Sequence, residues 1–162
     1  MRRIVVALLL TGLIAPFAAH AKHPPKQRPE DIPSGSTFKL RTTITVTPAN
    51  AVLYFQDAQL IANSAIQPDY VYCTFQLDNP PAATHKIEKQ VFTVTNIDFD
   101  EREIGNTRKV TSVTTIHLDA KRQTENARMA CQWPEHAPAT DTPTADEISG
   151  ALGKYFTLKR AP

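Results

Sequence analysis

Hydrophobic and polar residues alternate along several stretches of this chain, as they do in β-strands that bury one face. The alternation is clearest at residues 125–133, where Ala127, Met129, Cys131 and Trp133 share one face. Similar strand patterns cover residues 37–46, 51–56, 70–77, 90–99 and 109–119, with a short final candidate at 155–158. The pattern therefore predicts six or seven strands.

One helix is predicted near the C-terminus. Thr144 and Glu147 have the spacing of a capping box, in which each side chain accepts a hydrogen bond from the other residue's backbone N–H. Apolar residues then recur at helical spacing from Ile148 onwards, and Gly153 is suited to end the helix. We therefore expect a helix over about residues 144–153.

The two cysteines, Cys73 and Cys131, lie on the apolar faces of their respective strands. Both side chains would then point into the same core, which is the geometry that a buried disulfide needs. Closing the 58-residue loop between them would stabilise the fold by roughly 4 kcal/mol in the chain-entropy model. We expect a structural disulfide.

These elements indicate a mainly β fold: an antiparallel β-sandwich or a partly open barrel of six to seven strands, with one short C-terminal helix and one disulfide. The pattern is compatible with both the sandwich and the barrel. An immunoglobulin domain is disfavoured, because its core tryptophan lies between the two cysteines. Here the single tryptophan, Trp133, follows Cys131.

The first 21 residues have the pattern of a secretory signal peptide. Arg2 and Arg3 precede an apolar run at residues 4–14, and the small residues Ala19 and Ala21 stand before the expected cleavage site. The run is shorter than the ~20 residues that a membrane-spanning helix needs. We therefore expect cleavage near Ala21 and a mature chain in the periplasm or the medium.

The segment that follows the signal peptide, residues 22–36, differs from the rest of the chain. Its four prolines, several charges and near absence of apolar side chains predict an extended, poorly ordered leader. Residues 37–162 are long enough for one domain with a single core but short for two.

The charge balance excludes one class of partner. The chain has 18 lysines and arginines against 16 acidic residues, and removal of residues 1–21 takes away Arg2 and Arg3, leaving 16 against 16. Proteins that bind nucleic acid normally carry a strong basic excess, so we expect no nucleic-acid partner. No second apolar run is long enough to span a bilayer, so the mature chain is not expected to cross a membrane.

The sequence offers no catalytic, cofactor-binding or metal-binding residues. It lacks the motifs of serine hydrolases, zinc proteases, P-loop enzymes and dinucleotide-binding folds. The histidines of the mature chain, His23, His85, His117 and His136, are scattered. The carboxylates Asp98, Asp100, Glu101 and Glu103 lack the ligand order of a calcium loop, so we expect them to form a solvated hairpin tip. Because no catalytic motif is present, we expect that the protein is not an enzyme.

Three tyrosines form the one candidate contact face. Tyr70 and Tyr72 alternate with Cys73 and Phe75, and Tyr54 alternates with its apolar neighbours in the same way. If one face of the sheet carries the core, these rings would crowd the other face, and tyrosine is enriched at interfaces. The alternative is that the C-terminal helix packs over them as a second core layer.

The chain resembles small exported proteins of Gram-negative bacteria. The resemblance covers most of the mature chain and rests on Phe38-x-Leu40, Tyr70–Cys73, Phe92-x-Val94, Cys131-x-Trp133 and the closing Glu147-Ile148 with Leu152-Gly153. It implies a periplasmic or secreted location and no particular activity.

The sequence as a whole favours an exported, non-catalytic binding or interaction module of the cell envelope, whose partner is an envelope or extracellular protein. One alternative is a small-molecule carrier with a cavity inside a β-barrel. Another is a periplasmic inhibitor of a hydrolase. We expect no cofactor.

Overall fold

The computed structural model describes residues 32–67, 69–104, 109–120, 126–133 and 142–162 of the chain. The expected signal peptide and the leader residues 22–31 lie outside the described residues. The described part begins at Ile32, which is 2% exposed and belongs to the core. Close by, the backbone N–H of Gly35 donates to the Val94 carbonyl at 2.8 Å. Packing therefore begins five residues before Thr37, the expected start of order.

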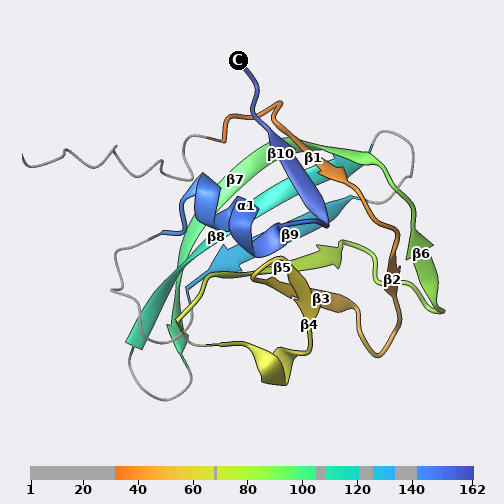
Figure 1. Ribbon diagram of the computed structural model, residues 1–162, viewed down its shortest axis with the longest axis horizontal. Coiled ribbons are helices and arrows are strands. Elements are labelled where there is room, and N and C mark those ends of the chain that lie inside the picture. Colours follow the sequence, from red (N-terminus) through yellow and green to blue (C-terminus); the bar gives the residue numbers. More distant parts are fainter. Residues whose placement is uncertain (1–31, 68, 105–108, 121–125, 134–141) are drawn as a thin grey trace, which may run out of the picture.

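One antiparallel sheet of eight strands dominates the fold. The strands are β1 (Thr37–Leu40), β3 (Val52–Gln56), β4 (Gln59–Ile61), β5 (Tyr72–Leu77), β7 (Val91–Ile104), β8 (Lys109–Ala120), β9 (Ala127–Gln132) and β10 (Phe156–Lys159). They are hydrogen-bonded in the order β10-β1-β7-β8-β9-β5-β3-β4. Figure 1 shows this sheet curling into a half-barrel.

The remaining elements are short. Strands β2 (Ile44–Val46) and β6 (His85–Ile87) form a separate two-stranded sheet. A 3₁₀ helix, η2 (Asn63–Ala65), follows β4, and the α-helix α1 (Ala145–Leu152) precedes β10. The helix confirms the predicted capping box, with Thr144 as N-cap and Gly153 as C-cap.

The mainly β class and the single α-helix are confirmed for the described residues, but the expected number of strands is wrong. The described residues form ten strands, eight of them in the main sheet. Strands β4 and β6 have three residues each, too few to show a period of two. Residues 37–46 form two strands rather than one, because the chain leaves the main sheet after Leu40. Thr42 stands at an apolar position of the pattern but is exposed.

Strand β7 is longer than its pattern predicts. It continues from the expected end at Phe99 to Ile104, and its register against β8 shifts between Val94 and Asn96. The carboxylates at 98–103 therefore lie along a strand rather than at a hairpin tip. They are all exposed, with Asp98 and Asp100 on one face of the strand and Glu101 and Glu103 on the other.

Aromatic side chains fill the concave side of the half-barrel. Four phenylalanines are fully buried: Phe38, Phe55, Phe75 and Phe92. Burial of each side chain stabilises the fold by about 1.5–3 kcal/mol. Helix α1 packs against β3, β5 and β10 and adds apolar side chains, among them Ile148, to the same core. The helix therefore closes the open side of the sheet (Figure 1).

The expected disulfide joins two neighbouring strands. Cys73 on β5 and Cys131 on β9 are directly opposite in the antiparallel register. Both residues are 0% exposed, as their place on the apolar faces of the two strands predicts.

Candidate functional site

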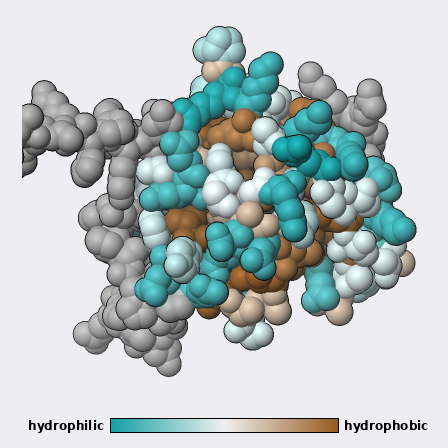
Figure 2. All heavy atoms as spheres, viewed as in Figure 1, coloured by the Kyte–Doolittle hydropathy of each residue, from teal (hydrophilic) through white to brown (hydrophobic). Residues whose placement is uncertain are grey.

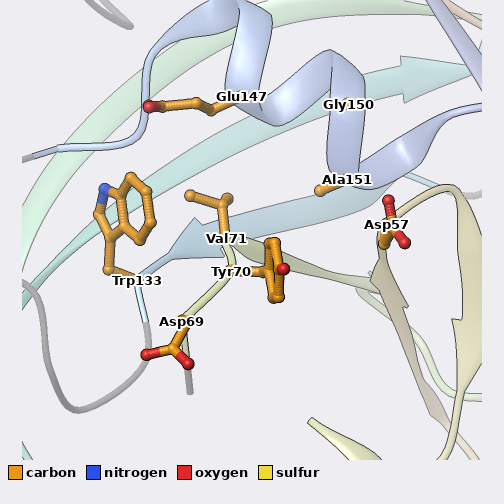
Figure 3. Close-up of a pocket in the computed structure, with 8 residues that line it drawn as sticks. All are labelled: Asp57, Asp69, Tyr70, Val71, Trp133, Glu147, Gly150 and Ala151. Carbon is orange, nitrogen blue, oxygen red and sulfur yellow. The ribbon is translucent and has the colours of Figure 1, made fainter. Parts of the chain in front are cut away.

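A surface hollow of about 210 Å³ lies where four segments of the chain meet beside the helix. Its walls are α1, the turn between β3 and β4, the residues that lead into β5, and the residue that follows β9 (Figure 3). We call it the α1 groove; it is lined by Asp57, Asp69, Tyr70, Val71, Trp133, Glu147, Gly150 and Ala151. Among the described residues, the lining combines three carboxylates with two aromatic rings and includes no basic side chain.

Asp57 reaches the groove from a tight two-residue turn. Gln56 and Gln59 are paired across the hairpin, and the two residues between them, Asp57 and Ala58, have φ angles of 48° and 59°. A positive φ at both central positions is typical of a type I′ turn, and L-residues adopt it at a cost of roughly 1–2 kcal/mol each. A turn normally built with glycine is thus made here with a side chain that lines the groove.

Helix α1 holds this turn in place. The backbone N–H of Ala58 lies 3.2 Å from the carbonyl oxygens of both Gly150 and Ala151. These carbonyls belong to the last turn of the helix, where intrahelical partners run out. The turn therefore supplies a hydrogen-bond donor to the last carbonyl groups of the helix, and the helix fixes the position of Asp57.

Gln56 positions the opposite wall. Its side chain is 3% exposed, and its amide nitrogen donates to the carbonyls of Tyr70 at 2.8 Å and Gln67 at 3.0 Å. Its amide oxygen accepts from the N–H of Gln67 at 2.8 Å. Three hydrogen bonds from one buried side chain thus tie the segment that carries Asp69 and Tyr70 to strand β3.

The capping box fixes the third carboxylate. Glu147 Oε2 accepts hydrogen bonds from the backbone N–H and the hydroxyl of Thr144, both at 2.8 Å. In return, the Glu147 N–H donates to the Thr144 hydroxyl oxygen at 3.2 Å. The box therefore holds a negative charge at the groove through contacts that begin the helix.

Gly150 keeps the helix wall of the groove open. A Cβ atom added at this position would meet no other atom within 4 Å. Glycine inside a helix is less stable than alanine by about 1 kcal/mol, and packing against the described residues gives no reason for it here. The absence of a side chain at Gly150 leaves space in the groove.

The three tyrosines predicted to share one face occupy two sites. Tyr70 precedes β5, is 55% exposed and lines the groove on the helix side. Tyr54 and Tyr72 lie half-buried on the face of β3 and β5 opposite Phe55 and Phe75. Because α1 packs on the phenylalanine face, the helix does not cover Tyr54 and Tyr72, whereas Tyr70 lies beside it in the groove.

The hydroxyl of Tyr72 has a raised pKa. Burial raises the pKa of its hydroxyl above the ordinary value, and the hydrogen bond that it accepts from the Gln132 side-chain amide partly offsets this effect. The ring belongs to the convex face of the sheet rather than to the groove.

A second hollow, of about 190 Å³, contains His117 and Thr95. His117 Nε2 lies 2.8 Å from Asp98 Oδ2, so an acid, an imidazole and a hydroxyl are near one another. The Thr95 hydroxyl, however, donates to the main-chain carbonyl of His117 at 3.3 Å and not to its ring. The side chains of His117 and Asp98 are 40% and 49% exposed, so their pairing contributes at most about 1 kcal/mol. This arrangement does not activate a nucleophile.

The described residues contain no group of three or more histidine, cysteine, aspartate or glutamate side chains placed to hold a metal ion. His23 and His136 lie outside the described residues. No helix in the described ranges has the length and apolar character that crossing a membrane requires.

Sequence reasoning found only one member of the groove, Tyr70. The other lining residues come from parts of the chain that share no motif, and no periodicity links Asp57 to Trp133 or Gly150. Comparisons with protein-family models, with curated proteins and with solved structures found no match for this chain. The geometry of the α1 groove is therefore the main indication of function.

Proposed function

We propose that this chain is an exported, non-catalytic binding module of the bacterial cell envelope, and that it contacts an envelope or extracellular protein at the α1 groove. The observation that carries the proposal is the construction of the groove. Hydrogen bonds from Gln56, from the Ala58 N–H and within the capping box fix three of its walls before any partner arrives. Walls that are ordered in advance lower the entropic cost of binding.

The composition of the groove supports the same proposal. Tyr70 and Trp133 give a contact surface of the aromatic type that is enriched where proteins bind one another. Tyr70 is 55% exposed, so its ring is open to a partner. The buried disulfide is compatible with a location outside the cytoplasm.

The carrier alternative is weaker on structural grounds. A β-barrel carrier needs an open interior, and ligand pockets for drug-sized molecules typically measure about 300–1,000 Å³. The concave side of this sheet is instead occupied by Phe38, Phe55 and Phe92 together with α1. The groove itself lies at the surface and is smaller than this range.

Site-specific photo-crosslinking in intact cells that export the protein tests the proposal. A benzophenone amino acid replaces Tyr70 in the groove or, as the matched control, Arg128, which is exposed on β9. We expect a discrete crosslinked product from position 70 and none from position 128. Equal labelling from both positions, or no product from position 70, would contradict the proposal. Identification of the product as a hydrolase would make the module an inhibitor.

N-terminal sequencing of the mature protein tests export. A chain that begins at Lys22 supports the proposed cleavage near Ala21, whereas recovery of an intact N-terminus from the cytoplasm would contradict it.

A further inference from the structure

We infer that the α1 groove binds a lysine or arginine side chain of a partner polypeptide; this inference rests on the proposed function and names the chemistry that the groove recognises. The charge, the aromatic lining and the size of the groove all fit such a side chain.

Charge complementarity selects a cation. Asp57, Asp69 and Glu147 line the groove from three different parts of the chain, and negative charges around one hollow favour a cation there. Two basic side chains of the described C-terminal residues have other partners: the Lys154 ammonium lies 5.6 Å from the centre of the Tyr155 ring, and Arg160 lies 3.5 Å from Asp146. A basic side chain entering the groove would be attracted by these carboxylates.

The aromatic lining selects a cation on an apolar stem. Trp133 and Tyr70 line the groove, and the faces of such aromatic rings attract ammonium and guanidinium groups within about 6 Å of the ring centre. Val71 and Ala151 add an apolar surface against which the methylene groups of lysine or arginine would lie. Figure 3 shows the Tyr70 ring and Val71 between the indole of Trp133 and Asp57, so apolar and acidic walls face the same hollow.

The size of the groove selects one side chain rather than a larger ligand. A volume of about 210 Å³ is small for a cofactor or a lipid. Gly150 lines this volume, and the space at its missing Cβ is empty. A bulky residue there would fill the groove from the exposed side of the helix.

The test uses two peptides of equal length that differ at one central residue, lysine or its uncharged isostere norleucine. Trp133 is the single tryptophan of the chain, so its fluorescence reports on the groove alone. We expect the lysine peptide to give a saturable change and to bind at least about tenfold more tightly than the norleucine peptide. Added salt should weaken only the lysine peptide.

Two sets of variants assign the binding to the groove. Asp57→Asn combined with Asp69→Asn should weaken the lysine peptide by at least about tenfold. The control, Asp100→Asn with Glu101→Gln, removes the same charge from exposed carboxylates on β7 and should leave binding unchanged. Gly150→Phe should abolish binding of the peptide without loss of folding, which circular dichroism verifies.

The outcomes separate this inference from the proposed function. Equal binding of the two peptides would overturn the inference and leave a groove that binds proteins without charge recognition. Absence of any response to the lysine peptide would overturn it as well, while crosslinking from position 70 would still support the module. Dimers that form with rising concentration and dissociate in the Asp57→Asn, Asp69→Asn variant would support charge recognition by the groove. They would contradict the proposed envelope partner, because a second copy of the chain would then be the occupant.

Discussion

A Cβ atom added to Gly153 would lie 2.0 Å from the Cβ of Ala58, far inside the distance at which two such atoms can pack. The two residues mark the contact between the end of α1 and the turn that joins β3 to β4. This contact, together with the hydrogen bonds from the Ala58 N–H to the helix, sets the distance between two walls of the α1 groove.

Gly153→Ala should therefore destabilise the protein. The added methyl group clashes with Ala58, and the backbone of residue 153, with φ of 46° and ψ of −122°, is one that L-residues rarely adopt. We expect a loss of at least about 2 kcal/mol in the free energy of unfolding, measured by urea denaturation. A midpoint equal to that of the unmodified protein would show that the turn and the helix separate at little cost.

Gly150→Ala, three residues earlier in the same helix, should have the opposite effect. The new methyl group meets no atom within 4 Å, and alanine favours the helix over glycine by about 1 kcal/mol. The same denaturation experiment should show a gain of up to that amount. A loss of stability would mean that the space beside Gly150 is needed for packing and not for a ligand.

Gln56→Leu should release the segment that carries Asp69 and Tyr70. The substitution removes all three hydrogen bonds of the Gln56 amide and leaves the Gln67 N–H and the Tyr70 carbonyl without this partner. We expect a loss of about 2–3 kcal/mol and faster hydrogen exchange at Gln67. The control is Gln59→Leu, because Gln59 is the exposed cross-strand partner of Gln56; it should change stability little, and an equal loss there would argue against the role of Gln56.

Replacement of both Cys73 and Cys131 by alanine should cost about 4 kcal/mol through loss of the 58-residue loop closure, with a further cost from the lost packing. Thermal unfolding with and without a reductant measures the effect. The reductant should lower the midpoint of the native protein and leave that of the double variant unchanged. A native midpoint that does not respond to complete reduction would contradict a stabilising role.

Tyr72 should make the protein less stable at high pH. Because the pKa of its hydroxyl is raised in the folded state, the unfolded chain loses this proton first as the pH rises. The free energy of unfolding should therefore be unaffected below about pH 10 and fall above it. Tyr72→Phe should flatten this fall relative to the native protein, and identical pH profiles for the two would show that another group causes it.

Much of the local structure follows from residue order alone. A period of two at residues 125–133 places Cys131 on the buried face of β9, and the spacing of Thr144 and Glu147 begins α1 where the structure has it. These features depend on residues within one helical turn or one strand, where the periodicity of side chains and the spacing of the capping box determine the local structure. The disulfide could be predicted for the same reason, because the pattern within each strand places its cysteine on the apolar face.

The curl of the sheet and the α1 groove were decided by tertiary structure. Tyr70 and Tyr72 share a parity in the sequence, but the strand begins at Tyr72, so Tyr70 is free to lie beside the helix with Asp57 and Trp133. Which segments meet there depends on how eight strands pair and close around one core, and that is a property of the whole chain's packing. The sequence determined which residues point inward; only the folded sheet brought four distant segments to one hollow.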